Sequence, residues 1–105
     1  MKINVLGTEY EVKKDDLNNP ALAENDGVCF IYKKQIILRK KEFLDGDEEE
    51  REKRNDHVMM HELIHAFAEE SGVQYGNNEE LVDWMARMIP LISSAYEKIK
   101  SETGE

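Results

Sequence analysis

Apolar and polar residues alternate in two parts of the first forty positions. Residues 2–12 alternate on both sides of Gly7-Thr8, which is the pattern of two short strands joined by a tight turn. Two further β-rich runs, 28–32 and 35–39, flank a Lys-Lys pair that is not of the favoured Asn-Gly turn type. The sequence therefore predicts two β-hairpins and leaves the geometry of the second turn open.

A connector at residues 15–27 separates the two predicted hairpins. Asn19 is suited to cap a short helix, and Pro20 is suited to the first helical position, where its missing N–H needs no partner. We expect a short helix there, with Gly27 closing the segment.

The second half of the chain changes to a helical period. Apolar residues between positions 58 and 68 occupy much of the circumference of one helix, which predicts a buried central helix. In the run 45–56 acidic residues come first and basic residues follow, as favoured in the exposed first turns of a helix. We expect this helix to begin near Asp47 and to end at about Ser71, where Gly72 can cap it.

A second long helix is predicted from about Asn78 to about Lys100. Pro90 lies inside it and should kink or interrupt it, because proline lacks an N–H and clashes with the preceding turn. Apolar residues recur along the helix at intervals of three and four, so one side of it is expected to face the core. That apolar face comprises Leu81, Val82, Met85, Met88, Ile89, Ile92, Ala95, Tyr96 and Ile99.

Composition narrows the class of protein. The chain has 105 residues, of which 40% are hydrophobic and 35% charged, the balance of a single globular domain over residues 1–105. The net charge of −9 does not suggest a nucleic-acid partner, and the basic residues within 33–41 are interpreted as a solvated strand edge. Cys29, the single cysteine, fits a reducing compartment, and no apolar run resembles a signal peptide or a membrane span. We expect a cytoplasmic protein with no membrane partner.

The chemistry suggested by the sequence centres on His61-Glu62-Leu63-Ile64-His65. His61 and His65 are one helical turn apart and project from the same face, so both imidazoles can bind one Zn²⁺. Glu62 lies about 100° further round the helix, beside the metal, where it can take a proton from a water that the metal activates. The alternative is a helix with two solvated histidines. The apolar surroundings argue against it, since buried imidazoles need partners.

A catalytic zinc site needs a third protein ligand. His57 lies two turns from His65, roughly 12 Å along the helix axis, so it is assigned to the rim of the site. The third ligand should then be a carboxylate from the second helix. Glu79 falls at the edge of its apolar face and is preferred; Glu80 falls on the solvated side and stays as the second choice. Alternatively, both are simply first-turn acids favoured by the helix dipole.

These residues carry a resemblance to a known family. H-E-x-x-H at 61–65, a short loop, and Asn78-Glu79 followed four residues later by Asp83 resemble the gluzincin group of zinc metallopeptidases. The segment is most similar to minimal phage- and prophage-encoded members, which are similar to the ImmA/IrrE-type peptidases. The resemblance covers about residues 28–92. The loop between His65 and Glu79 is shorter than in large gluzincins.

The resemblance implies a fold, a cofactor and a substrate class. The fold would be an α+β zincin-like core, with a small, mostly antiparallel sheet packed on the H-E-x-x-H helix and completed by the second helix. His61, His65 and Glu79 would bind Zn²⁺, Glu62 would act as general base, and Asp83 would orient a ligand imidazole. The substrate would be a peptide or a protein, such as a repressor. The usual tyrosine or histidine from a further domain is missing, which leaves Tyr75 and Tyr96 as candidates.

Two other functions remain open from the sequence. One is a metal-binding but non-proteolytic phage or prophage accessory protein that binds a protein partner, because 105 residues leave little wall for a cleft. The other is a structural protein without a metal. The sequence gives no information on oligomeric state.

Overall fold

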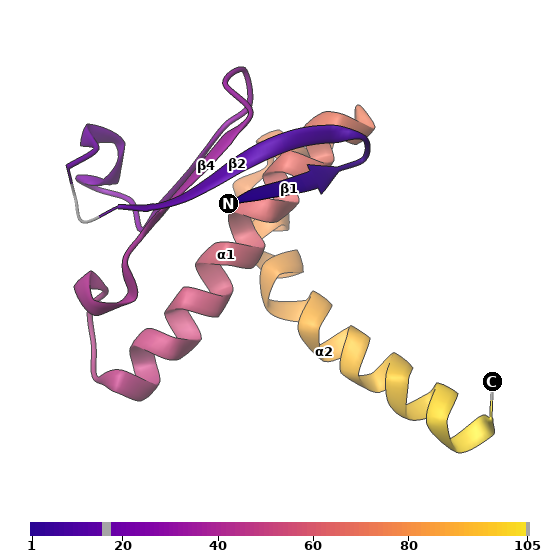
Figure 1. Ribbon diagram of the computed structural model, residues 1–105. Helices are drawn as coiled ribbons and strands as arrows, with labels where there is room; N and C mark the ends of the chain where they lie inside the picture. The colour runs from indigo at the N-terminus through magenta and orange to yellow at the C-terminus, as the bar shows by residue number, and fades with distance from the viewer. Residues whose placement is uncertain (16–17, 105) are drawn as a thin grey trace.

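A small mixed sheet packs against one long helix, and a second long helix crosses the first (Figure 1). The computed structural model describes residues 1–15 and 18–104, and of Tyr75 and Gly76 it describes the backbone alone. The fold is α+β, as expected. The elements are β1 (Lys2–Val5), β2 (Thr8–Asp15), β3 (Gly27–Phe30), β4 (Gln35–Arg39), α1 (Glu48–Ser71) and α2 (Glu79–Thr103), with short 3₁₀ helices at Pro20–Leu22, Lys41–Phe43 and Gln74–Asn77.

The strand order is β1-β2-β4-β3. The two predicted hairpins are present, since β1 pairs antiparallel with β2 and β3 pairs antiparallel with β4. The central pair β2 and β4 is parallel, so the expectation of a mostly antiparallel sheet is corrected to a mixed sheet. The connector after β2 carries the chain past the position of β4, so β3 forms at the edge and β4 returns between β2 and β3. This edge position of β3 matters for the site below.

The connector and the second turn follow the sequence in part. The Asn19 side chain accepts a hydrogen bond from the Ala21 N–H, with Pro20 at the first helical position, as predicted. Gly27 opens β3 rather than closing the connector. The turn of the second hairpin spans residues 31–34 and has Lys34 in the left-handed region at φ 54°.

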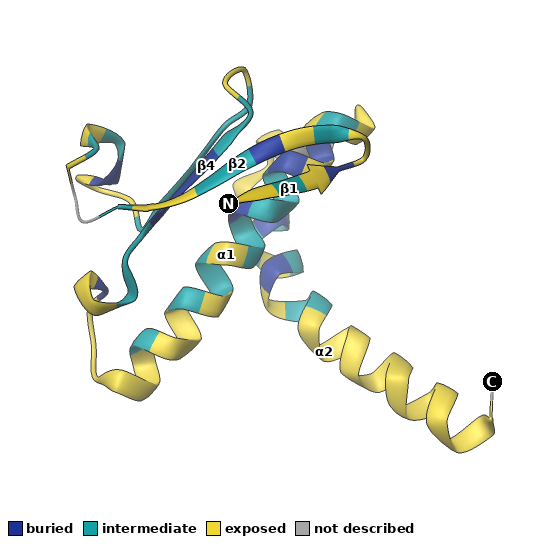
Figure 2. Ribbon diagram, in the orientation of Figure 1, coloured by how far each residue is buried: buried dark blue, intermediate teal, exposed yellow. Residues whose placement is uncertain are grey.

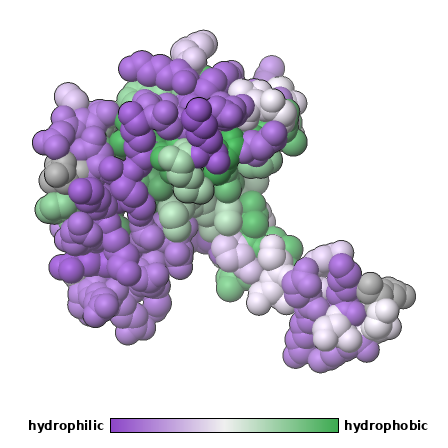
Figure 3. All heavy atoms as spheres, viewed as in Figure 1, coloured by the Kyte–Doolittle hydropathy of each residue, from purple (hydrophilic) through white to green (hydrophobic). Residues whose placement is uncertain are grey.

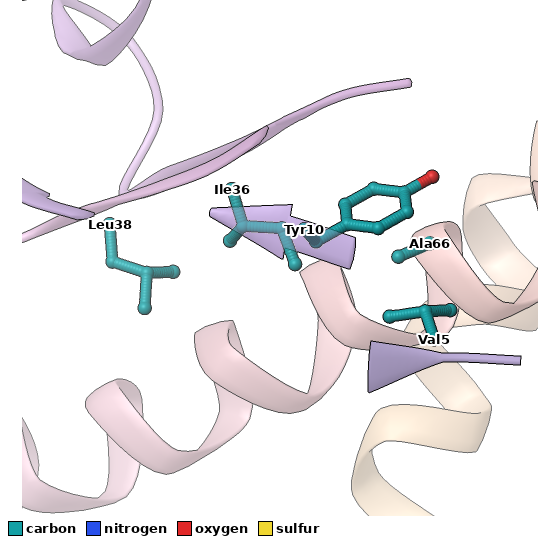
Figure 4. Close-up of a cluster of buried hydrophobic side chains, with 5 residues drawn as sticks. All are labelled: Val5, Tyr10, Ile36, Leu38 and Ala66. Atoms are coloured by element: carbon teal, nitrogen blue, oxygen red, sulfur yellow. The ribbon is translucent and has the colours of Figure 1, made fainter. Parts of the chain in front are cut away.

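The core lies between the sheet and α1. In Figure 4 the labelled side chains of the sheet point toward the helix, and Tyr10 lies beside Ala66. Burying each large side chain of this cluster contributes on the order of 1.5–3 kcal/mol. The Tyr10 hydroxyl donates a hydrogen bond to Glu70 Oε2 at 2.7 Å, so the buried ring keeps its polar end paired. Apolar side chains gather where the sheet meets the helices (Figure 3). The cluster comprises Val5, Tyr10, Ile36, Leu38 and Ala66.

Helix α1 begins and ends where the sequence predicts. Asp47 is its N-cap and forms a reciprocal capping box with Glu50, and Gly72 ends the helix with a φ of 77°. The expectation of a buried central helix is met on one side of α1 only. One side packs on the sheet, whereas Met59 and Phe67 are each 37% exposed.

Helix α2 packs on α1 only in its first half. The Asn78 side chain caps it by accepting from the Leu81 N–H, and Val82 and Ala86 are buried. The helix continues through Pro90 without interruption, and from there to Gly104 every residue is exposed (Figure 2). The expectation that its apolar face meets the core as far as Ile99 is therefore wrong beyond Pro90. We call residues 91–104 the C-terminal arm.

The described helices contain no segment that is both long and apolar enough to cross a membrane.

Candidate metal centre

His61 and His65 of α1 and Glu79 of α2 point their polar atoms at one spot. The Nε2 atoms of His61 and His65 are 3.3 Å apart, and they lie 3.0 Å and 2.9 Å from the two carboxylate oxygens of Glu79. In a tetrahedral zinc site, neighbouring ligand atoms are separated by about 3.3 Å, given metal–ligand distances of about 2.0–2.1 Å. Two imidazole nitrogens and a carboxylate are a ligand set that Zn²⁺ accepts. The donor set and its spacing therefore fit the metal.

Local structure explains why Glu79 rather than Glu80 reaches the histidines. Asn78 caps α2, so Glu79 is its first residue and lies next to α1 at the point where the two helices meet. Glu80 is exposed and is not part of the cleft lining. The structure thus brings the preferred candidate to the two histidines and leaves the second choice in solvent.

Glu62 is the buried acid of the site. It is 8% exposed and lines the same cleft as His61 and His65. The pKa of Glu62 is raised to about 7, and burial is the main cause. The nearby Glu79 also raises this pKa, whereas the nearby His61 lowers it. A carboxylate whose pKa lies near neutrality can both accept and return a proton at physiological pH.

The close approach of β3 to α1 depends on Gly27. A Cβ added there would lie 2.7 Å from Val58 Cγ1 and 3.1 Å from Glu62 Cγ. Only a residue without a side chain lets the edge strand lie this close to the helix without a shift. Gly27 therefore sets the distance between Glu62 and the strand that forms the opposite wall of the cleft.

Asp83 lies one turn after Glu79 but has a different first partner from the one expected. Its Oδ1 is 2.7 Å from His57 Nε2 and 4.0 Å from His61 Nδ1. The His57 bond also lowers the pKa of Asp83. Asp83 thus approaches the far nitrogen of the His61 ring without reaching hydrogen-bond distance. His57 contacts the site through Asp83 and is not part of the group formed by His61, His65 and Glu79.

A cleft of about 510 Å³ opens beside the converging residues. Its size is in the range of ligand-binding pockets. The edge strand β3 contributes Val28 and Cys29, α1 contributes Glu62 and Glu69, and Asn77 lies before α2. The sequence had not singled out Glu69 or Asn77, and only their positions near H-E-x-x-H and the N-cap could have drawn attention to them.

Of the two tyrosine candidates, the structure describes the side chain of Tyr96 alone, and it does not join this cleft. Tyr96 is 58% exposed on the C-terminal arm, well past the last α2 residue that packs on α1, so it is not positioned to assist there. The side chain of Tyr75 lies outside the described part of the structure. Burial, with the Glu62 charge beside it, raises the pKa of Cys29 to about 12, so this thiol stays protonated and is not a nucleophile at neutral pH.

Comparisons of the chain with protein-family models, with curated proteins and with solved structures found no match in any of the three.

Proposed function

We propose that the protein is a zinc-dependent peptidase of minimal zincin type, similar to the gluzincins and the ImmA/IrrE-type enzymes. The observation that carries this proposal is the convergence of His61, His65 and Glu79 within hydrogen-bond distance of one another, with buried Glu62 in the same cleft. A bound Zn²⁺ would explain why two imidazole nitrogens lie against one carboxylate beside a buried acid. The ligand set, the neighbouring acid and the cavity are the three parts that metal-assisted hydrolysis requires.

Each residue of the centre has a role in the proposed reaction. A Zn²⁺ ion held by His61, His65 and Glu79 would supply Lewis-acid polarisation of a water and of the peptide carbonyl. Glu62 accepts the proton of the attacking water and later gives it to the departing amine, so the peptide C–N bond breaks with no net proton change on the enzyme. The raised pKa of Glu62 serves both transfers.

The substrate is proposed to bind as an extended chain along β3. This strand lies at the edge of the sheet with β4 as its only strand partner among the described residues, and it forms one wall of the cleft. A peptide can add to such an edge through main-chain hydrogen bonds, with side chains read by the cleft. A peptide or protein with an accessible extended segment fits this surface, and the resemblance adds a repressor as one example.

A second function, partner binding without hydrolysis, is favoured by apolar surface away from the centre. A groove of about 360 Å³ between α1 and α2 is lined by apolar residues that include Met60, Phe67 and Ile89. Leu91 and Ile99 on the C-terminal arm are each 63% exposed. Such surface is typical of protein-binding sites and would suit an accessory protein.

The deciding experiment combines metal analysis with a cleavage assay. Purified protein reconstituted at neutral pH should contain about one Zn²⁺ per chain, measured by mass spectrometry of metals. A proteomic digest should yield new peptide termini with wild type and none with Glu62→Gln, which should keep its zinc and its fold. A folded chain that binds no zinc overturns the proposal. Zinc with no cleavage in either sample favours the accessory protein.

A further inference from the structure

Glu69 is a carboxylate in the cleft that the proposed chemistry does not use. It lies on α1 one turn after His65, is exposed, and lines the same cavity as the metal-binding candidates. Within the described part of the chain, no side chain forms a hydrogen bond or an ion pair with its carboxylate. Its neighbour Glu70 differs in this respect, because it accepts from Tyr10 and Lys34 at 2.7 Å each. Glu69 is therefore available to an external group.

The negative charge of Glu69 has no positive counterpart among the described residues that line the cleft. The two positive charges of a bound Zn²⁺ would be matched by Glu62 and Glu79, which leaves the Glu69 charge over. No lysine or arginine is among the described residues that line the cavity. The whole chain also carries a net charge of −9, which attracts positive groups to its surface. The cleft is thus suited to a cationic side chain.

The position of Glu69 indicates which substrate residue it would meet. Glu69 is four positions after His65 on α1, about 6 Å along the helix axis. An extended peptide advances about 3.3 Å per residue, so Glu69 lies roughly two residues from the scissile bond. Ile31 and Val73 line the cleft as well and offer apolar contact for the alkyl stem of a lysine or an arginine.

The direction of β3 determines on which side of the scissile bond this residue lies. The first residue of β3, Gly27, lies against Val58 and Glu62, whereas Lys34 at the far side of the hairpin turn pairs with Glu70. Strand β3 and helix α1 therefore run in the same direction. A peptide that adds antiparallel to β3, the more stable ladder, passes Glu69 before it reaches Glu62.

We propose that the cleft selects peptides that carry lysine or arginine two or three residues before the scissile bond, and that Glu69 is the residue that determines this preference. The inference rests on the proposed peptidase function for its position relative to a scissile bond. It adds a substrate class, basic peptide segments, to that function.

The preference can be tested with decapeptides that are acetylated at one end and amidated at the other. They carry Lys, Gln or Glu at the second and third residues before the scissile bond and are otherwise identical. Wild type is expected to show a kcat/KM about fivefold higher for Lys than for Gln, the upper range for an exposed ion pair, and the ratio should fall with added salt. Glu69→Gln should bring the ratio to about one, and Glu69→Lys should favour Glu. The matched control Glu97→Gln removes one charge on the C-terminal arm and should keep the wild-type ratio.

Peptide binding separates this inference from the proposed activity. Zinc-loaded Glu62→Gln protein is titrated with the fluorescently labelled Lys and Gln peptides, with and without Glu69→Gln. Tighter binding of the Lys peptide that Glu69→Gln abolishes supports the subsite even if wild type cleaves nothing, in which case only the peptidase proposal falls. Equal binding of both peptides, no binding of either, or a Lys preference that survives Glu69→Gln overturns the subsite.

Discussion

At the scale of single residues, Gly27 connects the fold to the site. Replacing it with alanine puts a methyl group 2.7 Å from Val58 Cγ1, so the strand or the helix must shift. Gly27→Ala is expected to destabilise the protein by about 1–3 kcal/mol, the usual effect of overpacking. If the proposed peptidase function is right, it should also reduce hydrolysis, because Glu62 moves. Thermal unfolding and the cleavage assay measure the two effects.

The double variant Gly27→Ala, Val58→Ala is the control for this prediction. Removing the Val58 methyl groups makes room for the new side chain, so the two changes should be less than additive in the free energy of unfolding. If the two effects on the free energy of unfolding are fully additive, the contact with Val58 is not the reason that position 27 excludes a side chain.

Glu70 supplies a pH dependence of stability that does not involve the candidate metal centre. Bonds from Lys34, Tyr10 and Thr8 lower its pKa from 4.5 to about 2 in the folded protein. Between pH 2 and 4.5 the unfolded chain binds more protons at this residue, so folding stability rises with pH across this window. The contribution is complete above pH 4.5 and is lost as the pH falls toward 2.

Glu70→Gln should therefore have a lower Tm than wild type at neutral pH. The difference in Tm is expected to shrink as the pH falls from 4.5 toward 2, because the wild-type carboxyl then becomes neutral too. Parallel thermal melts from pH 2 to 7 measure this. A difference that stays constant over the whole range would show that the ion pair with Lys34 does not contribute through its charge.

At the scale of elements, the rotation of α2 about its own axis determines which of its acids reaches His61 and His65. Glu79→Ala is expected to weaken zinc binding by more than about 100-fold, a greater loss than removal of an outer partner of a ligand causes. Glu80→Ala changes a neighbouring exposed acid and should leave the zinc affinity within about twofold, since the side chain does not line the cleft. Competition with a chromophoric chelator measures both affinities. The reverse result would mean that α2 is turned by one residue in solution.

The sequence predicted the helix ends well because the signals there are local. Asp47 with Glu50 and Asn78 with Leu81 satisfy N–H groups within the same turn, and Gly72 adopts the left-handed conformation that few other residues tolerate. The convergence of His61 and Glu79 could also be anticipated, since it needs only a helical face and a short loop. The helix ends depend on residues within one turn, and the contact between His61 and Glu79 spans two helices joined by a short loop.

Features that depend on distant residues were missed. No local pattern says that β2 pairs in parallel with β4 or that β3 lies at the edge, because that choice is made by packing on α1. The preference of Asp83 for His57 over His61 depends on how α1 and α2 cross. Apolar periodicity likewise could not show where α2 leaves the core, because the pattern continues to Ile99 after the contacts have ended at about Pro90.

At the scale of the whole molecule, the C-terminal arm makes the protein more extended than a compact domain with the same number of residues. The radius of gyration is 15.1 Å and the longest extent is 49 Å, whereas a compact domain of this length has a radius of gyration of about 13 Å. The difference comes from the second half of α2, which projects away from the sheet (Figure 1). An exposed helical segment of this length is only marginally stable on its own in water.

A chain that ends at Ile92 tests whether the arm contributes to the fold. Residues 93–104 are exposed throughout, so their removal should change the Tm by less than about 4 °C, the shift that 1 kcal/mol produces in a domain of this size. Zinc content and peptide cleavage should also be retained, because the cleft is built from residues before Pro90. The helical signal in circular dichroism should fall as the arm is lost. Two results together would mean that the arm packs against apolar surface in solution. They are a larger drop in Tm and a loss of helical signal smaller than the length of the arm predicts.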